Sequence, residues 1–310
     1  MTEILMAALL ALALDRYVPD RAGFKLWEWY GDWADSIEQR FNGGSRAHGV
    51  SAVLLATVPI LIGVLLAHYI LDEISWLLAF VFDVLAVYLC VDLYRLGSAA
   101  DSVSSALESN DVAQAAQQLR ALTGKETVET TEAGVAHAAV ETVLKQANSL
   151  VIAPLFWFIL LGPFGVVLQH MASILDRLWG HRNERYAEFG WAAARLDDLL
   201  GWIPARITAI SYAVVGSFED ALHCWRRKAG MWSDINSGPL LASGLGAMHM
   251  TNCEETEEED AYGNKVVSPT VLADASHVRR VMALVWRVLL FWLAVAVLMS
   301  GAHLFGLFAR

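Results

Sequence analysis

The stretch His48-Gly-Val-Ser-Ala-Val-Leu-Leu-Ala-Thr-Val-Pro-Ile-Leu-Ile-Gly-Val-Leu-Leu-Ala-His-Tyr-Ile-Leu71 contains no Asp, Glu, Lys or Arg. A helix rises about 1.5 Å per residue, so a helical run of this length can cross a hydrocarbon core of about 30 Å. Two further apolar runs, at 76–96 and 281–308, are also long enough to span. These runs predict an all-α, polytopic helical integral membrane protein with a soluble helical loop domain.

The composition agrees with a membrane protein. The chain of 310 residues is 56% hydrophobic and has a mean hydropathy of +0.44, which is more apolar surface than one soluble core can hide. The formal net charge is −11, so the chain lacks the basic surface on which nucleic-acid binding depends. We therefore expect the lipid bilayer as a partner and exclude nucleic acid.

Two shorter segments precede the first span. Residues 3–14 form an apolar run that is too short to span alone and has no cleavage site of the signal-peptide type. Residues 24–41 place Trp27, Tyr30 and Trp33 at helical spacing, with acidic residues between them. This second segment is expected to be an amphipathic helix at the membrane interface with an aromatic belt.

The middle of the chain changes character twice. Residues 97–148 are rich in Ser, Ala, Gln and Glu and predict soluble helices. The apolar run at 150–175 is divided by Gly162-Pro163 into two pieces, each shorter than the roughly 20 residues that a span needs. A re-entrant hairpin and a kinked span both fit this pattern. They place the Lys/Arg-containing loops differently, so the orientation stays open.

These patterns divide the chain into six regions. They are N-terminal apolar and amphipathic interfacial helices (1–47), a transmembrane helical pair (48–96), a soluble helical region (97–148), a broken apolar hairpin with motif-bearing helices (149–228), a polar loop with an acidic run (229–278) and a C-terminal transmembrane helix (279–310). Within the second span, Asp83 either pairs with another helix or has a functional role.

The stretch Trp191–Ala209 carries the charged residues that most need an explanation. Arg195, Asp197, Asp198 and Arg206 interrupt a largely apolar run, where an unpaired charge in lipid would cost about 2.5–3.5 kcal/mol. Adjacent carboxylates can share Mg²⁺, and arginines bind phosphate. Neighbours on a helix point about 100° apart, however, so an Arg195–Asp198 or Asp198–Arg206 ion pair is the alternative that the spacing favours.

A second motif follows at Asn236-Ser-Gly-Pro239, which leads into a helix of small residues at 242–248. Small residues permit close helix packing or close approach of a ligand. The sequence contains neither a P-loop nor a dinucleotide-binding glycine motif, so no standard nucleotide loop is predicted.

Four segments together resemble the CobD/CbiB family, which comprises membrane proteins of cobalamin biosynthesis that attach an aminopropanol arm to adenosylcobyric acid. The segments are Val151-Ile-Ala-Pro-Leu-Phe-Trp157, Tyr186-Ala-Glu-Phe-Gly-Trp-Ala-Ala-Ala-Arg-Leu-Asp-Asp198, Ile203-Pro-Ala-Arg-Ile-Thr-Ala209 and Asn236-Ser-Gly-Pro239. The resemblance covers most of the chain, and its aspartate pair and Pro-Ala-Arg motif are fairly specific.

The chain also departs from the family pattern. The family has His-Pro-Val after an early Asp-Arg, whereas no His-Pro follows Asp15-Arg16 here. Before the Ala-Pro-Leu stretch, the family's Glu-Asn and Asp-Gly are replaced by Lys145-Gln146 and Ser149-Leu150. The related AmpE proteins, inner-membrane proteins connected with β-lactamase induction, also lack those residues. The chain therefore resembles a divergent branch of the family close to AmpE.

Two functional hypotheses follow from the resemblance. The first is an ATP-dependent, amide-forming ligase like cobinamide-phosphate synthase, with ATP and Mg²⁺ as cofactors and a corrinoid as substrate. In that case Arg195, Arg206 and Asn236 would bind substrate, Asp197 and Asp198 would bind the metal, and the catalytic residues stay unassigned. The second is a non-enzymatic, AmpE-like signalling or regulatory protein. Both imply a multi-pass protein of the inner (plasma) membrane, and a homo-oligomer remains open.

Overall fold

The computed structural model describes residues 2–18, 26–123, 131–181, 183–232, 234–251 and 271–304, together with the strand residues 258–259 and 265–266. Most of the acidic run at 254–260 lies outside the described residues, as does the end of the run predicted at 281–308. The elements are α1 (Thr2–Tyr17), α2 (Leu26–Phe41), α3 (Arg46–Ile74), α4 (Trp76–Cys90), α5 (Leu93–Glu108), α6 (Val112–Thr123), α7 (Glu132–Ala147), the π-helical turn η1 (Asn148–Ile152), α8 (Ala153–Trp179), α9 (Trp191–Val215), α10 (Phe218–Lys228), the 3₁₀ turn η2 (Ala229–Met231), α11 (Ser237–Ala247), the antiparallel pair β1 (Glu258–Glu259) and β2 (Lys265–Val266), and α12 (Ala275–Leu304).

The all-α membrane class is confirmed. Among the described residues, four helical segments are long and apolar enough to cross a bilayer, namely Arg46–Ile74, Trp76–Glu108, Glu132–Trp179 and Ala275–Met299. The chain folds as two compact units, each made of two sequence segments. Unit 1 contains Met1–Leu93 and Ser149–Ile203, and unit 2 contains Tyr94–Asn148 and Pro204–Arg310.

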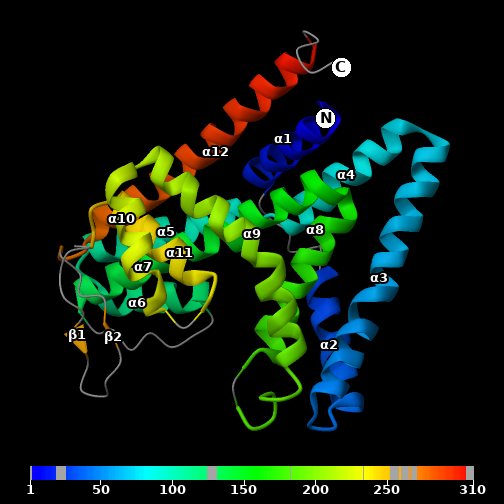
Figure 1. The fold of residues 1–310 in the computed structure, drawn as a ribbon, viewed down its shortest axis with the longest axis horizontal. Coiled ribbons are helices and arrows are strands. Elements are labelled where there is room, and N and C mark those ends of the chain that lie inside the picture. The colour runs from blue at the N-terminus through cyan, green and yellow to red at the C-terminus, as the bar shows by residue number, and fades with distance from the viewer. Residues whose placement is uncertain are drawn as a thin grey trace. The chain divides into compact units, whose positions relative to one another are not determined.

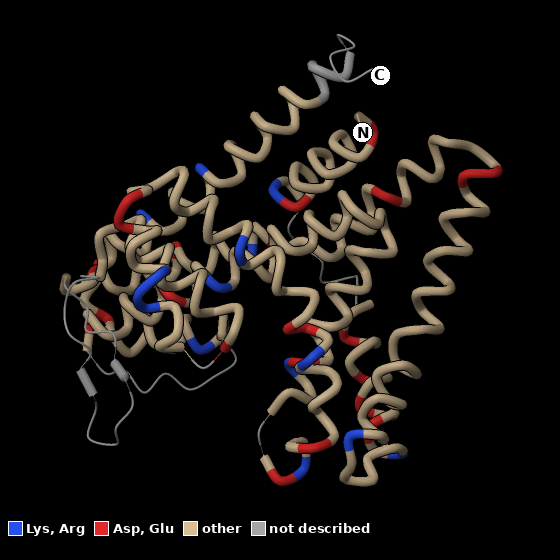
Figure 2. The backbone as a smooth tube through the Cα atoms, viewed as in Figure 1, with Lys and Arg blue, Asp and Glu red and all other residues tan. Residues whose placement is uncertain are grey.

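In unit 1 the first predicted span forms α3 without interruption. Ser45 begins the helix, because its hydroxyl accepts a hydrogen bond from the amide of His48. Apolar side chains along α3 face outward, as Leu54, Ile62 and Leu66 are each more than half exposed. Figure 2 shows α3 free of charge between its two ends. An exposed apolar helix of this length is the surface that lipid covers.

The predicted second span at 76–96 lies within the candidate membrane segment Trp76–Glu108, and the structure adds a break inside it. Helix α4 begins at Trp76, where the Ser75 hydroxyl accepts a hydrogen bond from the amide of Leu77, but it ends at Cys90. The backbone is non-helical at Val91 and Asp92, and the Asp92 amide donates to the carbonyl of Leu150 in η1 at 3.1 Å. Asp83 does meet another helix, because its Oδ1 lies 3.3 Å from Nε2 of His68 on α3.

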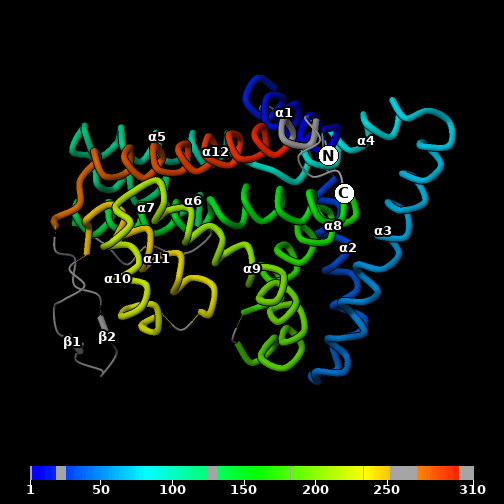
Figure 3. The backbone as a smooth tube through the Cα atoms, turned by 45° about the horizontal axis from the view of Figure 1, so that its top comes forward, coloured from blue at the N-terminus to red at the C-terminus, as the bar shows by residue number. Residues whose placement is uncertain are grey.

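Helix α8 is the centre of unit 1, since it packs against α1, α2, α3 and α4. It breaks at Gly162, whose φ of 61° and ψ of −149° are essentially restricted to glycine. Beyond the break the chain turns back (Figures 1 and 3). A Cβ atom on Gly165 would lie 2.3 Å from the carbonyl oxygen of Trp157, eight residues earlier. In a continuous helix such residues would be about 12 Å apart, so the segment is bent sharply back on itself.

Unit 2 joins the segment 97–148 to the C-terminal third of the chain. Helix α7 is largely buried and contacts α6, α11 and α12. Helix α11 is buried from Gly238 to Ala247. The segment 97–148 is therefore not a separate body, because its helices share a core with α10, α11 and α12.

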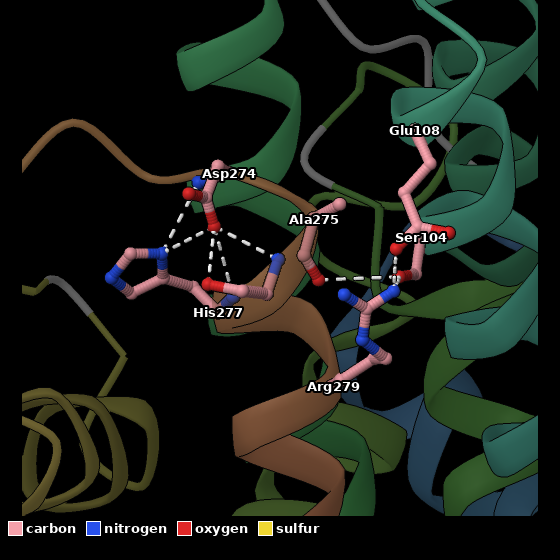
Figure 4. A network of polar contacts seen from close by, with 7 residues as sticks. Ser104, Glu108, Asp274, Ala275, His277 and Arg279 are labelled. Carbon is pink, nitrogen blue, oxygen red and sulfur yellow. Dashed lines mark hydrogen bonds and ion pairs between the residues drawn. The ribbon is translucent and has the colours of Figure 1, made fainter.

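Helix α12 begins at a polar network that also fixes it to α5 (Figure 4). The Asp274 carboxylate accepts a hydrogen bond from the Ser276 hydroxyl at 2.6 Å and lies 2.8 Å from Nδ1 of His277, and these two side-chain contacts are the main reason why the pKa of Asp274 is lowered to about 2. The amides of Ser276 and His277 also donate to this carboxylate and so cap the start of α12. On the neighbouring turn, Arg279 pairs with Glu108 and donates to the Ser104 hydroxyl. These contacts fix the start of α12 to α5 within unit 2.

Candidate functional site

Helix α9 carries four of the five residues predicted to bind substrate or metal. It begins at Trp191, directly after Gly190, whose Cβ would lie 1.7 Å from the carbonyl oxygen of Trp179. Only glycine permits this close approach of α9 to the end of α8. The boundary between the two units falls within α9, so the residues before it belong to unit 1 and Arg206 belongs to unit 2.

In unit 1, the structure forms one of the two predicted ion pairs. Arg195 Nη1 lies 3.2 Å from Asp198 Oδ2, three residues further along the helix. The Arg195 side chain is 62% exposed and the Asp198 side chain is 35% exposed. Asp197 and Asp198 both lie within α9, where neighbours point about 100° apart, so Asp197 projects from a different face of the helix than Asp198. The two carboxylates therefore have different surroundings.

No group of three or more His, Cys, Asp or Glu residues lies close enough to share a metal ion within the described part of the chain. Mg²⁺, however, is usually held by only one or two carboxylates, with water and substrate phosphates as the remaining ligands. One carboxylate of the two, Asp197 or Asp198, fits that kind of donor set, because neighbours on a helix point about 100° apart and cannot both face one ion.

In unit 2, the structure brings Arg206 to Asn236. Arg206 Nη1 donates to Asn236 Oδ1 at 3.0 Å, and Nη2 donates to the carbonyl of Ile235 at 3.2 Å. Two nitrogens of the guanidinium are thus fixed by the residues that precede α11. Burial lowers the pKa of Arg206, and the nearby Asp234 carboxylate acts in the opposite direction.

Asp234 explains why this turn is rigid. Its carboxylate accepts hydrogen bonds from the amides of Asn236 and Ser237 and from the Ser237 hydroxyl. It therefore occupies the N-terminus of α11, which would otherwise be available to an anion. An anion that reaches this place would meet the Arg206 guanidinium and not the start of α11.

The small residues of α11 serve close packing, which was one of the two predicted uses. A Cβ on Gly238 would lie 2.1 Å from the Ala229 carbonyl oxygen, and a Cβ on Gly244 would lie 2.5 Å from the Leu144 side chain. These glycines let α11 sink among α7, α10 and η2, which places Asn236 firmly beside Arg206.

Sequence reasoning missed a line of buried polar contacts on the second half of α9. Thr208 donates to Asn148 Oδ1 at 2.9 Å, and Tyr212 donates its hydroxyl hydrogen to the Leu144 carbonyl at 2.8 Å. Ser243 of α11 donates to the Ala209 carbonyl at 2.6 Å. The only signal in the sequence was that Thr208 and Tyr212 are spaced four residues apart, which places them on one face of a helix.

The positions where the chain departs from the resembled pattern have structural contacts. Gln146 donates to the Leu122 carbonyl at 2.8 Å and so ties the end of α7 to α6. Leu150 supplies the carbonyl that receives the Asp92 amide. The first contact fixes the end of α7, and the second fixes the break after α4 against η1.

Comparison with known proteins identifies the family. Residues 8–285 match the family model described as CobD/Cbib protein. A protein of Stutzerimonas stutzeri (strain A1501) named "Cobalamin biosynthesis protein CobD" is 38% identical over 283 residues, which cover 89% of this chain and 91% of that protein.

Two further proteins carry the same name. One from Chromobacterium violaceum is 40% identical over 203 residues, covering 66% of this chain and 64% of its own length. One from Dehalococcoides mccartyi is 29% identical over 258 residues, covering 80% and 83%. No solved structure matches this chain. None of these findings supports the predicted closeness to AmpE or the AmpE-like role.

Proposed function

This chain belongs to the CobD/CbiB family, and from that membership we propose that it acts in cobalamin biosynthesis at the inner membrane of the cell. We propose that it resembles adenosylcobinamide-phosphate synthase and binds a corrinoid together with a phosphate-bearing partner. The proposed reaction joins an amine to a carboxylate of the corrinoid, with ATP as the energy source.

The observation that carries the site assignment is the fixed position of Arg206. Its guanidinium is partly buried and is oriented by Asn236 and by the Ile235 carbonyl. An oriented guanidinium recognises phosphate through paired hydrogen bonds, and it loses little conformational entropy on binding. In this proposal Arg206 binds the anionic group, and Asn236 contributes by positioning Arg206 and by lying beside the bound group.

Asp197 or Asp198 would hold Mg²⁺ together with the phosphates of the bound nucleotide. The ion would neutralise negative charge on the phosphates while ATP reacts. Arg195 orients the Asp198 carboxylate, since the two side chains are 3.2 Å apart. Arg195 is also exposed enough to reach a second anionic group.

Genetic complementation tests the proposal. A strain that lacks its cobinamide synthase is transformed with the parent chain, with Arg206→Gln, or with Arg280→Gln as a matched control on the exposed surface of α12. We expect the parent and the control to restore cobalamin-dependent growth and Arg206→Gln to reduce it strongly. Failure of the parent, at an expression level equal to that of an active relative, would overturn the enzymatic function.

A further inference from the structure

One face of α2 forms an open groove that the proposed function does not use. Trp29, Asp32, Trp33 and Ser36 line this groove, which has a volume of about 470 Å³. A volume of this size can hold a small organic group. Trp29 is 54% exposed, so a large apolar ring faces outward at the edge of the groove.

The two indole rings form a single aromatic surface. Their centroids lie 5.3 Å apart with a tilt of 52° between the planes, so the rings touch each other and leave no slot between them. A ligand would therefore lie across the outer faces of both rings. The face of an indole attracts cations within about 6 Å more strongly than any other side-chain ring.

The residues that line the groove include one charged group, the carboxylate of Asp32. Asp32 lines it, and Asp35 lies one helical turn further along. The pKa of Asp35 is raised by partial burial and then by the negative charges of Glu38 and Asp32, while Arg185 acts against this increase. Glu38 itself is buried and held by Arg185 and Asn42. The groove thus repels anions and favours a cation near Asp32.

We propose that the α2 groove binds an organic ammonium group, with the cation over the Trp29–Trp33 rings and its charge beside the Asp32 carboxylate. The aromatic surface prefers a large, weakly hydrated ammonium to a small metal ion, because π faces compete poorly with water for strongly hydrated cations. The same chemistry is offered by the headgroup of a zwitterionic phospholipid and by a soluble amine. The proposal does not depend on the site at Arg206.

Titration of the full chain, purified in a maltoside detergent that has no ammonium group, tests the proposal. Tetramethylammonium is the probe, and sodium at equal concentration controls for simple charge screening. We expect saturable binding of tetramethylammonium that sodium does not abolish. Trp29→Leu and Asp32→Asn should each weaken it about fivefold, the effect of losing one cation–π or charge contact.

Glu73→Gln is the matched control, because it removes one exposed negative charge at the end of α3, outside the lining of the groove. It should bind like the parent, and all variants should keep the parent's thermal unfolding temperature. Equal binding by the parent, Trp29→Leu and Asp32→Asn would overturn the proposal, as would binding that sodium removes completely.

A second measurement separates the two sources of the ammonium group. The protein is reconstituted in nanodiscs with equal amounts of phosphatidylethanolamine and phosphatidylglycerol, and the retained lipid is counted by native mass spectrometry. Retention of phosphatidylethanolamine that Trp29→Leu abolishes would support a lipid ligand. Retention that is unchanged by Trp29→Leu, together with Trp29-dependent tetramethylammonium binding, would support a soluble amine.

Discussion

Glu38 is a buried carboxylate that depends on Arg185. The Glu38 side chain is 3% exposed, and Arg185 Nε and Nη2 contact its two oxygens at 2.9 and 2.5 Å. The hydrogen bond from Arg185 is the main reason why the pKa of Glu38 is lowered. Arg185→Met would leave the carboxylate with only the Asn42 amide as a described side-chain donor. We expect a loss of about 1–3 kcal/mol in the free energy of unfolding at neutral pH.

The stability lost in Arg185→Met should depend on pH, because the pKa of Glu38 is lowered in the folded state. Because the pKa is lower in the folded state, this stabilisation is fully present above the unfolded value near 4.5 and disappears as the pH falls through the lower folded value. The difference in stability between Arg185→Met and the parent should therefore shrink in acid. Chemical unfolding at pH 7 and pH 4 measures it, and a difference that grows in acid would contradict the assignment.

Asp198 belongs to an exposed ion pair, so replacing it should have only a small effect on stability. Arg195 and Asp198 are 62% and 35% exposed, and exposed pairs of this spacing contribute about 0.2–1 kcal/mol. Asp198→Asn should thus cost less than about 1 kcal/mol, as measured by thermal unfolding in detergent. Any large loss of Mg²⁺-dependent ligand binding in this variant would then come from the loss of a metal ligand and not from unfolding. A destabilisation of about 3–5 kcal/mol would show that Asp198 is instead a buried structural partner.

The sequence predicts these residues only in part. The helical period places Arg195 and Asp198 on one face, and the structure confirms this ion pair, which was one of the two alternatives. It could not link Arg206 to Asn236, because thirty residues separate them and the contact depends on how α11 packs. Arg206 and Asn236 were assigned together to substrate binding only by the family resemblance, which implied no direct contact between them.

At the scale of elements, the bend of α8 requires a glycine at a position that no local pattern marks. A Cβ on Gly165 would lie 2.3 Å from the Trp157 carbonyl oxygen and 2.7 Å from the Leu161 Cβ, and the first of these obstacles is backbone. Gly165→Ala should therefore destabilise the protein by about 1–3 kcal/mol. Thermal unfolding in detergent would show this as a lowered midpoint.

Gly63 on α3 is the matched control, since nothing lies within 4 Å of its added Cβ. Gly63→Ala should be neutral or stabilising by up to about 1 kcal/mol, because alanine favours the helix. If both variants behave alike, the close contact between the two parts of α8 is wrong.

Hydropathy predicts the helices that lipid covers better than those that other helices cover. The uninterrupted run at 48–71 became α3, since nothing in the fold opposes its helical preference. The run at 76–96 did not predict the break after Cys90, because a single charge such as Asp92 near the end of a span can reach the interface and need not end the helix. That break depends on the bond from the Asp92 amide to Leu150, which is distant in sequence.

At the scale of the whole molecule, the contacts within unit 1 predict which ends of its helices lie on the same side of the membrane. The loop before α9 meets the start of α3, because Arg46 Nε lies 2.8 Å from Glu188 Oε2 and Gly49 approaches the Phe189 carbonyl. In a cysteine-free background, Ala47→Cys and Glu184→Cys should be labelled from the same side of the membrane. Glu73→Cys, at the other end of α3, should be labelled from the opposite side.

An impermeant maleimide applied to intact cells and to inverted vesicles measures this. Labelling of Ala47→Cys and Glu184→Cys from opposite sides would rule out the described contact. Protection of Glu73→Cys from both sides would instead show that α3 does not cross the bilayer.

The division of unit 1 into two sequence segments has a consequence for how the protein is made. Helix α8, which contacts α1, α2, α3 and α4, leaves the ribosome only after all of α5, α6 and α7. At about 5–20 residues per second, the first four helices wait for at least several seconds at the translocon before their central partner arrives. During that interval their inner faces must be shielded by lipid or by a membrane chaperone. A nascent chain that stalls before Ala153 would therefore be an early target for membrane proteases.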